Sequence, residues 1–244
     1  HYYNPLWGYQ NGEKRNASVG HQQSPLTILN HEWKINSKSE LETAVGYQFG
    51  SNSVSGLDWF NAPDPRPDFY RRLPSFIDDP AAQAEAINQW KNNEAFRQIN
   101  WDRMYEVNNN NYETVTDVNG IAGNDVTGRR SRYIVADRVQ DTKRVSFAST
   151  YNSTITDHII LTAGVNYQSQ KTDYYLRVAD LLGGDFFVDL NQFAEQEYPD
   201  SIETSQNNLD NPNNLVRVGD KYGYNYTATI NRTGVWIQPQ FKFN

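Results

Sequence analysis

The sequence predicts an all-β protein: about six antiparallel strands that form part of a transmembrane β-barrel, with long loops that carry short helices. Three observations predict this fold class. Apolar and polar residues alternate with a period of two in several segments, and short connections alternate with long ones along the chain. Aromatic residues make up 14% of the chain, although its hydrophobic content is only 37%. Soluble globular chains usually reach roughly 45–50%, so this chain has few apolar residues with which to build an ordinary core.

The composition excludes several classes of protein. The chain has 22 Lys and Arg residues against 29 Asp and Glu residues, a net charge of −7, and it lacks the basic stripe that neutralises nucleic-acid phosphates. Its purely apolar stretches, such as 159–161, are far shorter than the roughly 20 residues of a membrane-spanning helix. Without Cys there are no disulfides, thiolate nucleophiles or Cys-ligated zinc sites. We therefore expect no nucleic-acid partner and no spanning helix.

Six segments alternate between apolar and polar residues, and each is predicted to be a strand. They are 26–35, 40–50, 143–152, 158–174, 221–231 and 235–243. In 40–50 the odd positions are mostly apolar and the even positions are polar or small. The segment 158–174 repeats this pattern, with Leu161 and Val165 alternating with Thr162 and Asn166. Because successive side chains of a strand point to opposite faces, each strand is predicted to have one apolar and one polar face.

The connections between these strands favour a barrel. Turns of hairpin length are predicted at 36–39, 153–157 and 232–234, whereas the segments 51–142 and 175–220 are far longer. In an up-and-down sheet, alternate connections leave at the same end, so all short turns lie at one end and both long loops at the other. Bacterial outer-membrane barrels have short periplasmic turns and long extracellular loops. Compact soluble domains rarely contain loops longer than about 15 residues.

The long loops are expected to contain local structure. Asp79 followed by Pro80 is typical of a helix start, and residues 81–96 favour a helix. A second short helix is predicted at 176–182, ahead of two glycines. The asparagine-rich stretches 108–111 and 207–214 are predicted to be exposed loop.

The sequence does not indicate an enzyme, and we predict no catalytic, cofactor-binding or metal-binding residues. G-x-S-x-G, H-E-x-x-H and glycine-rich phosphate loops are absent. The His residues are far apart in the chain: His1, His21, His31 and His158. Segment 117–125 offers carboxylate and amide oxygens of the kind that calcium prefers, but it lacks the spacing of an EF-hand and also fits a plain Asn/Gly turn.

One set of loop residues is a candidate for recognising a ligand or partner. It combines aromatic and Arg side chains within a proline-rich stretch of the loop 51–142: Trp59, Phe60, Phe69, Tyr70, Arg71 and Arg72. Such side chains offer large contact areas and directional hydrogen bonds. The alternative interpretation is that the aromatic residues form a small core of the loop itself. The basic cluster 129–132 similarly fits either a solvated strand entry or a grip on an anionic ligand.

Three segments carry a resemblance to a known family. YNPLWGYQNG at 3–12, LDWFNAPDPRPD at 57–68 and DLNQFA at 189–194 resemble barrel segments of TonB-dependent outer-membrane receptors of the Bacteroidetes type. Members of that family have a barrel of about 22 strands filled by an N-terminal plug, and many carry a carboxypeptidase-regulatory-like domain ahead of the plug. Neither a plug nor a TonB box is recognisable in this chain. The resemblance therefore implies an internal barrel fragment of residues 1–244.

The resemblance also implies a location and a function. It places the chain in the bacterial outer membrane, in contact with lipid, and implies a part in energy-coupled uptake of an unidentified nutrient. The TonB system, acting through the plug region, and surface lipoproteins or other outer-membrane complex subunits are the expected partners. Two alternatives stay open: a barrel that is a structural component of an outer-membrane complex without transport, and a soluble all-β ligand-binding module.

Overall fold

The computed structural model describes residues 4–198 and 202–243, so His1 and Tyr3 lie outside the described residues. The described chain is mostly β, with 54% strand and 18% helix, which confirms the all-β prediction. It divides into two compact units, which are described separately. Unit 1 comprises 1–20, 54–138 and 175–225, and unit 2 comprises 21–53, 139–174 and 226–244.

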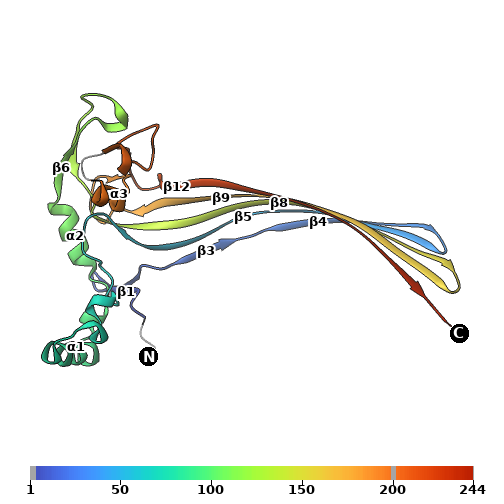
Figure 1. Cartoon of the computed structure of the whole chain (residues 1–244), viewed down its shortest axis with the longest axis horizontal. Helices are drawn as coiled ribbons and strands as arrows, with labels where there is room; N and C mark the ends of the chain where they lie inside the picture. Colours follow the sequence, from blue (N-terminus) through green and yellow to red (C-terminus); the bar gives the residue numbers. More distant parts are fainter. Residues whose placement is uncertain (1–3, 199–201, 244) are drawn as a thin grey trace. The chain divides into compact units, whose positions relative to one another are not determined.

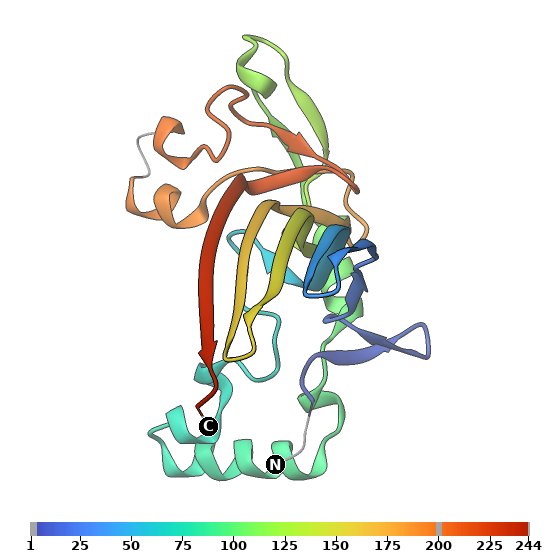
Figure 2. The same cartoon turned by 90° about the vertical axis from the view of Figure 1, so that its right-hand side faces the viewer.

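The largest sheet has six strands. They are β3 (Gly20–Gln23), β4 (Leu26–Asn36), β5 (Ser39–Trp59), β8 (Tyr133–Thr156), β9 (Ile159–Asp180) and β12 (Lys221–Phe241). Their order is β12-β9-β8-β5-β3, and β4 also pairs with β5, so β3 and β4 lie along the same edge. Figure 1 and Figure 2 show the long strands side by side in this order. Within the described residues the sheet is open, with β12 at one edge and β3 and β4 at the other.

Two short turns agree with the sequence analysis. Strands β4 and β5 are antiparallel, with Leu29 opposite Val45 and Trp33 opposite Leu41, and only Ser37 and Lys38 separate the strands. The two residues at 157–158 likewise separate β8 from β9. These lengths are typical of β-hairpins.

The third predicted turn, at 232–234, is wrong. A single strand, β12, runs through both segments that the sequence divided into 221–231 and 235–243. The reason is pairing with β9: a Cβ added to Gly234 would lie 2.4 Å from Oδ1 of Asn166, so the two strands remain in close contact there. Arg232, Thr233 and Gly234 have the composition of a turn, but cross-strand pairing decides their conformation.

The strands are also longer than predicted, and the loops correspondingly shorter. β5 extends to Trp59 and β8 begins at Tyr133, so the first long connection is 60–132 instead of 51–142. The predicted helix at 176–182 is wrong, because β9 continues to Asp180 and the chain then turns through Leu182 and Gly183, both with positive φ. The second long connection is accordingly 181–220.

Unit 1 contains one end each of the long strands β5, β8, β9 and β12, and all of the helices of the described residues. Its short strands are β1 (Trp7–Gln10), β2 (Glu13–Asn16), β6 (Tyr112–Val115), β7 (Val126–Arg129), β10 (Phe187–Val188) and β11 (Leu215–Val216). Its α-helices are α1 (Pro80–Asn92), α2 (Trp101–Asn110) and α3 (Gln192–Glu197). Its 3₁₀ turns are η1 (Tyr70–Arg72), η2 (Pro74–Phe76), η3 (Ala95–Arg97), η4 (Val118–Gly120) and η5 (Ile202–Ser205).

Helix α1 confirms the predicted start, although it ends earlier than predicted. The side chain of Asp79 accepts a hydrogen bond from the backbone N–H of Ala82 at 2.7 Å, and Pro80 occupies the first turn. Helix α2 was missed, because its C-terminal asparagines were interpreted as exposed loop. Asn108 is instead completely buried.

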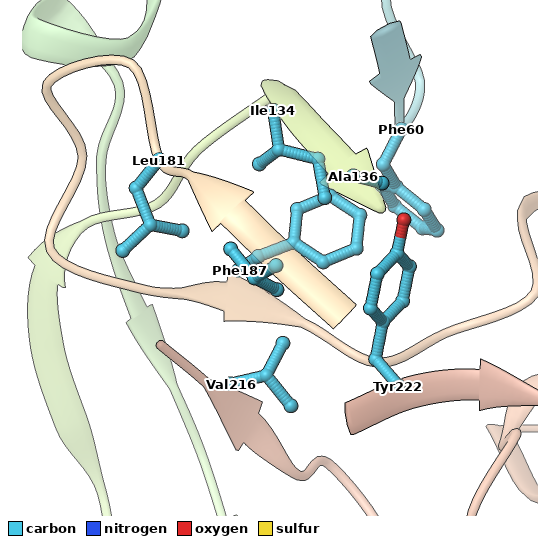
Figure 3. Packing of buried hydrophobic residues seen from close by; sticks show 8 residues of the cluster. Phe60, Ile134, Ala136, Leu181, Phe187, Val216 and Tyr222 are labelled. Atoms are coloured by element: carbon cyan, nitrogen blue, oxygen red, sulfur yellow. The ribbon is translucent and has the colours of Figure 1, made fainter. Parts of the chain in front are cut away.

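The first core cluster of unit 1 is built from residues far apart in sequence. Its buried members are Phe60, Ile134, Ala136, Val178, Leu181, Phe187, Val216 and Tyr222. The ring of Phe187 packs edge-on against Phe60 and Tyr222, with centroid separations of 6.5 and 5.6 Å (Figure 3). The cluster therefore ties the strand ends to the connection 181–220.

The second core cluster uses residues of the opposite parity on the same strand ends. Its buried members are Ala17, Ile99, Trp101, Met104, Tyr133, Val135 and Leu182. In β8, Tyr133 and Val135 thus belong to this cluster, whereas Ile134 and Ala136 belong to the first. Both faces of this part of the sheet are covered by the loops of unit 1.

Candidate functional site

In unit 2, by contrast, most of the exposed large apolar side chains stand at odd-numbered positions of the sheet, while Leu26, Ile28, Tyr226, Ile230 and Trp236 are exposed at even-numbered ones. We define the apolar face by the following exposed residues: Leu29, Trp33, Ile35, Val45, Tyr47, Phe49, Val145, Val165, Tyr167, Val235, Ile237 and Phe241. Leu29 is 72% exposed and Ile237 is 69% exposed. Isolated exposed apolar residues are normal in soluble proteins, but a contiguous set marks an interaction surface.

Cross-strand contacts show that these odd-numbered residues share a face. The β4–β5 register places Leu29 opposite Val45. Between β5 and β8, the hydroxyl groups of Thr43 and Ser149 are hydrogen-bonded at 2.9 Å, so odd positions again meet. Between β9 and β12 the even positions meet, because a Cβ added to Gly164 would lie 2.6 Å from the ring of Trp236. Between β8 and β9 the hydroxyl groups of Thr142 and Thr172 are hydrogen-bonded at 3.1 Å, so even positions meet there as well. The odd positions of all these strands therefore lie together on the other face.

The opposite face of unit 2 is more polar. Its residues line an open cavity of about 500 Å³, together with Leu26, Ile28 and neighbouring side chains. We define the polar face by Gln48, Arg144, Ser146, Asn166, Gln168 and Arg232, all of which line this cavity. The parity predicted from the sequence for 158–174, with Val165 and Asn166 on different faces, agrees with this arrangement.

Polar or charged residues end the apolar face on three strands. Ser51 follows Phe49 on β5, Lys143 and Asp141 precede Val145 on β8, and the corresponding residues of β9 are Lys171 and Asp173. These residues share the lining of one cavity of about 380 Å³, which shows that they lie close together. The change from apolar to polar or charged side chains therefore occurs at the same level of the sheet.

The six predicted recognition residues divide into two groups in unit 1. Phe60 is 2% exposed and belongs to the first core cluster, and Trp59 packs against the second. The guanidinium of Arg66 lies 5.3 Å from the centroid of the Trp59 ring. Trp59 is the last residue of β5, and Phe60 packs with residues of β8, β9, β12 and the connection 181–220, so both belong to the core of unit 1 and not to a separate core of the loop.

The other four residues lie at or near the surface around η1. The Tyr70 ring packs edge-on against Phe69 and Phe76, at 4.8 and 4.9 Å, and its hydroxyl accepts a hydrogen bond from Nε of Arg71 at 3.0 Å. Arg72 turns back toward the proline-rich segment, where Nη2 donates to the carbonyl of Asp64 at 2.7 Å. Arg71 and Arg72 are neighbours in sequence, but they have different surroundings.

Arg72 lines a cavity of unit 1 that combines polar and apolar walls, which we call the arginine cavity. Its volume is about 570 Å³, within the range of small-molecule sites. Polar side chains come from Asn61, Asp64, Arg72, Asn100, Arg103, Asn110, Asn111, Arg132 and Tyr133. Apolar lining comes from Ala62, Pro63, Pro65, Met104 and Val107. The lining therefore contains three Arg residues and one Asp residue, in a chain whose net charge is −7.

Tyr133 lies among these charges. Its hydroxyl donates to the carbonyl of Pro63 at 2.8 Å. Burial raises the pKa of the Tyr133 phenol, while the charges of Arg72 and Arg103 act in the opposite direction. Both guanidinium groups therefore exert their field at the same point in the cavity wall.

The sequence analysis identified Arg72 and Arg132 but missed Arg103, Asn100 and Tyr133. Helix α2 positions Arg103 and Asn100. The sequence of this helix contains a signal that predicts it: Trp101, Met104, Tyr105 and Asn108 have the i, i+3, i+4, i+7 spacing of a helix face. Asn100 caps that helix by accepting a hydrogen bond from the N–H of Arg103 at 2.9 Å.

The basic cluster 129–132 is largely neutralised by ion pairs. Arg129 pairs with Asp185 at 2.6 Å, and Glu113 accepts from both Arg130 at 3.1 Å and Arg132 at 2.5 Å. Burial raises the pKa of Glu113, but the charges and hydrogen bonds of Arg130 and Arg132 outweigh it and lower the pKa overall. Most of the cluster is thus structural, and Arg132 alone of its members lines the arginine cavity.

Removing the Glu113 carboxylate should have a pH-dependent cost. Glu113→Gln is expected to lower the free energy of unfolding by about 2 kcal/mol at neutral pH, in line with hydrogen bonds to charged groups. The folded-state pKa of Glu113 lies below its ordinary value of 4.5. The stabilisation is therefore fully present above that value and is lost as the pH falls through the folded-state pKa. Urea unfolding of wild type and variant across acidic and neutral pH measures the difference.

Glu106→Gln is a matched control for this experiment, because Glu106 forms an ion pair with Arg103 in which both side chains are more than half exposed. Its cost should stay below about 0.5 kcal/mol at every pH. A Glu113→Gln cost that is independent of pH would contradict the prediction.

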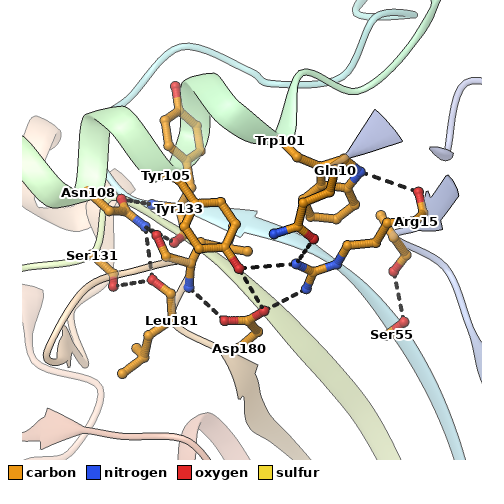
Figure 4. A network of polar contacts seen from close by, with 12 residues as sticks. Gln10, Arg15, Ser55, Trp101, Tyr105, Asn108, Ser131, Tyr133, Asp180 and Leu181 are labelled. Carbon is orange, nitrogen blue, oxygen red and sulfur yellow. Dashed lines mark hydrogen bonds and ion pairs between the residues drawn. The ribbon is translucent and has the colours of Figure 1, made fainter. Parts of the chain in front are cut away.

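A buried polar network holds helix α2 against the strand ends (Figure 4). Nδ2 of Asn108 donates to the carbonyls of Tyr133, Leu181 and Leu182 at 2.8, 2.9 and 3.1 Å. Its Oδ1 accepts from the backbone N–H groups of Arg132 and Tyr133 at 2.8 and 3.1 Å. One amide side chain thus lies within hydrogen-bonding distance of five backbone groups, with the three carbonyls sharing its two N–H donors.

A second part of the same network surrounds Arg15. Its guanidinium pairs with Asp180 at 2.6 Å, donates to Gln10, and lies 4.2 Å from the centroid of the Trp101 ring. The indole of Trp101 in turn donates to the carbonyl of Arg15 at 3.3 Å. These contacts attach the β1–β2 hairpin to α2.

Among the described residues, no group of three or more His, Asp or Glu side chains is arranged to hold a metal ion. In the 117–125 loop, Oδ1 of Asp117 accepts from the N–H of Gly123 and Oδ1 of Asp125 accepts from the N–H of Asp117. These contacts fit the interpretation of that loop as an Asn/Gly turn. None of the described helices has both the length and the apolar character needed to cross a membrane.

Comparison of the chain with protein-family models, curated proteins and solved structures gave no match.

Proposed function

We propose that this chain is part of the wall of an outer-membrane β-barrel of the TonB-dependent receptor type, which takes part in energy-coupled nutrient uptake. The observation that carries the proposal is the apolar face of unit 2. An exposed apolar surface on one parity of a sheet is unfavourable in water, whereas in a lipid bilayer it is the side that contacts acyl chains. The resemblance of three sequence segments to that family supports the type of receptor.

The dimensions of the apolar face support a membrane location. The stretch of β5 from Leu41 to Phe49 is nine residues long, at the lower end of the roughly 9–11 residues with which a tilted strand crosses a bilayer. Outer-membrane barrels flank their outward apolar band with aromatic residues. Tyr47 and Phe49 stack at 5.7 Å next to the charged boundary, as expected of an aromatic girdle.

The polar face supports the same proposal. Gln48, Arg144 and Asn166 would be costly in contact with acyl chains, but they suit the water-filled or plugged interior of a barrel. The open edges at β12 and at β3 and β4 also support it, because a barrel closes only when further strands pair with both edges. The unpaired edges are therefore where the remaining strands of such a barrel would add.

Labelling of single cysteines tests the proposal without background, because the chain contains no Cys. We would introduce Cys at Val45 or Val165 on the apolar face, and at the adjacent Ala44 or Asn166 as matched controls. Each variant is labelled with an environment-sensitive nitrobenzoxadiazole dye and refolded into phosphatidylcholine vesicles. Dyes at 45 and 165 should show blue-shifted emission, and dyes at 44 and 166 should not.

Equal emission at adjacent positions, or a blue shift at the even positions, would contradict the membrane proposal. So would a sharp, reversible unfolding transition of a soluble monomer in the absence of detergent. Either result would favour the soluble all-β binding module.

A further inference from the structure

We infer that the arginine cavity of unit 1 binds a small organic carboxylate, of about the size of a short acidic peptide. This inference is independent of the proposed membrane function, because every residue that lines the cavity belongs to unit 1. It rests on the charges in the lining, on the way they are held, and on the volume and apolar walls of the cavity.

The lining has a local excess of positive charge. Arg72, Arg103 and Arg132 contribute three cations, and the carboxylate of Asp64 is the one acidic group in the lining. That carboxylate is already engaged: it accepts from Nε of Arg66 at 2.9 Å and from Nη2 of Arg66 at 2.5 Å. Arg103 and Arg132 are paired with Glu106 and Glu113, which lie outside the lining, so an anion that enters the cavity meets one cation, Arg72, that forms no ion pair among the described residues.

Arg72 is the group best prepared to bind an anion. Its guanidinium donates to the carbonyls of Asp64 and Arg66, at 2.7 and 3.3 Å, and within the described parts of the chain it forms no ion pair. These neutral acceptors hold the side chain in place without cancelling its charge. A fixed guanidinium loses little conformational entropy when it binds a carboxylate through two parallel hydrogen bonds.

Arg103 is a second, weaker contributor. Its partner Glu106 is 58% exposed and Arg103 itself is 63% exposed, so water already screens this pair. Exchange of one solvated carboxylate for another costs little. Arg132 is different, because its guanidinium is already hydrogen-bonded to the half-buried Glu113. Arg132 therefore contributes positive charge near the cavity and offers few free N–H donors to a ligand.

The volume and the walls indicate an organic ligand instead of a simple inorganic ion. A cavity of about 570 Å³ is far larger than a phosphate or sulfate ion requires. Met104, Val107 and the two prolines offer apolar contact for a carbon skeleton. Asn100, Asn110 and Asn111 add amide groups that can donate to and accept from peptide groups. Carboxylates on a short peptide backbone satisfy all three features.

The test is calorimetric titration of the full chain in detergent micelles with N-acetyl-Glu-Glu. N-acetyl-Gln-Gln, which has nearly the same shape without the charges, and inorganic phosphate are titrated in parallel. We expect saturable binding of the acidic peptide only. The variants Arg72→Gln and Arg103→Gln should each weaken it, with Arg72→Gln reducing affinity by about tenfold or more.

Arg71→Gln is the matched control, since it removes the same charge from the neighbouring residue, which does not line the cavity. It should leave the affinity within about twofold of wild type. An equal loss in Arg71→Gln would reduce the effect to general electrostatics and overturn the site. Equally tight binding of phosphate or of the neutral peptide would overturn the ligand class, and absence of saturable binding would overturn the inference. None of these outcomes bears on insertion of unit 2 into vesicles.

Discussion

Asn108→Ala should destabilise the folded chain by about 3–5 kcal/mol. The substitution removes the side-chain partner of the Tyr133 and Leu182 carbonyls and of the Arg132 and Tyr133 N–H groups, while the Leu181 carbonyl keeps its bond from Ser131 Oγ. Each unsatisfied buried group costs roughly 1–3 kcal/mol before the structure relaxes. Asn108 itself is completely buried, so water cannot take the place of its amide. Urea unfolding monitored by tryptophan fluorescence measures the cost, because Trp101 lies at the start of the same helix.

Asn110→Ala is the matched control for this variant, since Asn110 is an exposed residue of the same helix. Its cost should stay within about 0.5 kcal/mol. If both substitutions cost the same, the network in Figure 4 does not contribute to stability as described.

The second large effect concerns the two faces of β9. Val165→Arg should destabilise the protein folded in phospholipid vesicles by about 2–4 kcal/mol, the cost of an arginine on the lipid side near the bilayer midplane. Asn166→Arg, one residue away on the opposite face, should cost much less. The measurement is the free energy of unfolding from vesicles in guanidinium chloride. Equal costs, or a larger cost at Asn166, would show that the two faces have been assigned the wrong way round.

The sequence was sufficient where structure depends on local pattern. The alternation in 26–35 and 40–50 predicted β4 and β5 and their hairpin, and Asp79 with Pro80 predicted the start of α1. Each of these features depends on residues within a few positions of one another. Period-two alternation and helix capping are therefore visible without knowledge of the rest of the chain.

The errors arose where distant residues decide the conformation. Gly234 has the composition of a turn, but pairing with β9 keeps it in a strand. Asn108 lies in an asparagine-rich stretch that is typical of an exposed loop, but its amide donates hydrogen bonds to the backbone carbonyls of Tyr133, Leu181 and Leu182. The arginine cavity could not be derived for the same reason, since its lining comes from three separated stretches, 61–72, 100–111 and 132–133.

The first core cluster implies an order of events during folding. Its buried members range from Phe60 to Tyr222, so the cluster cannot close until the chain has been synthesised through Tyr222. The β4–β5 and β8–β9 hairpins need only two-residue turns, and closing such short loops is fast. Both hairpins should therefore form before this cluster closes, and their apolar residues stay exposed to water in the meantime. During that interval the partly folded chain is most prone to aggregation, and a chaperone that binds the exposed apolar residues would have its largest effect.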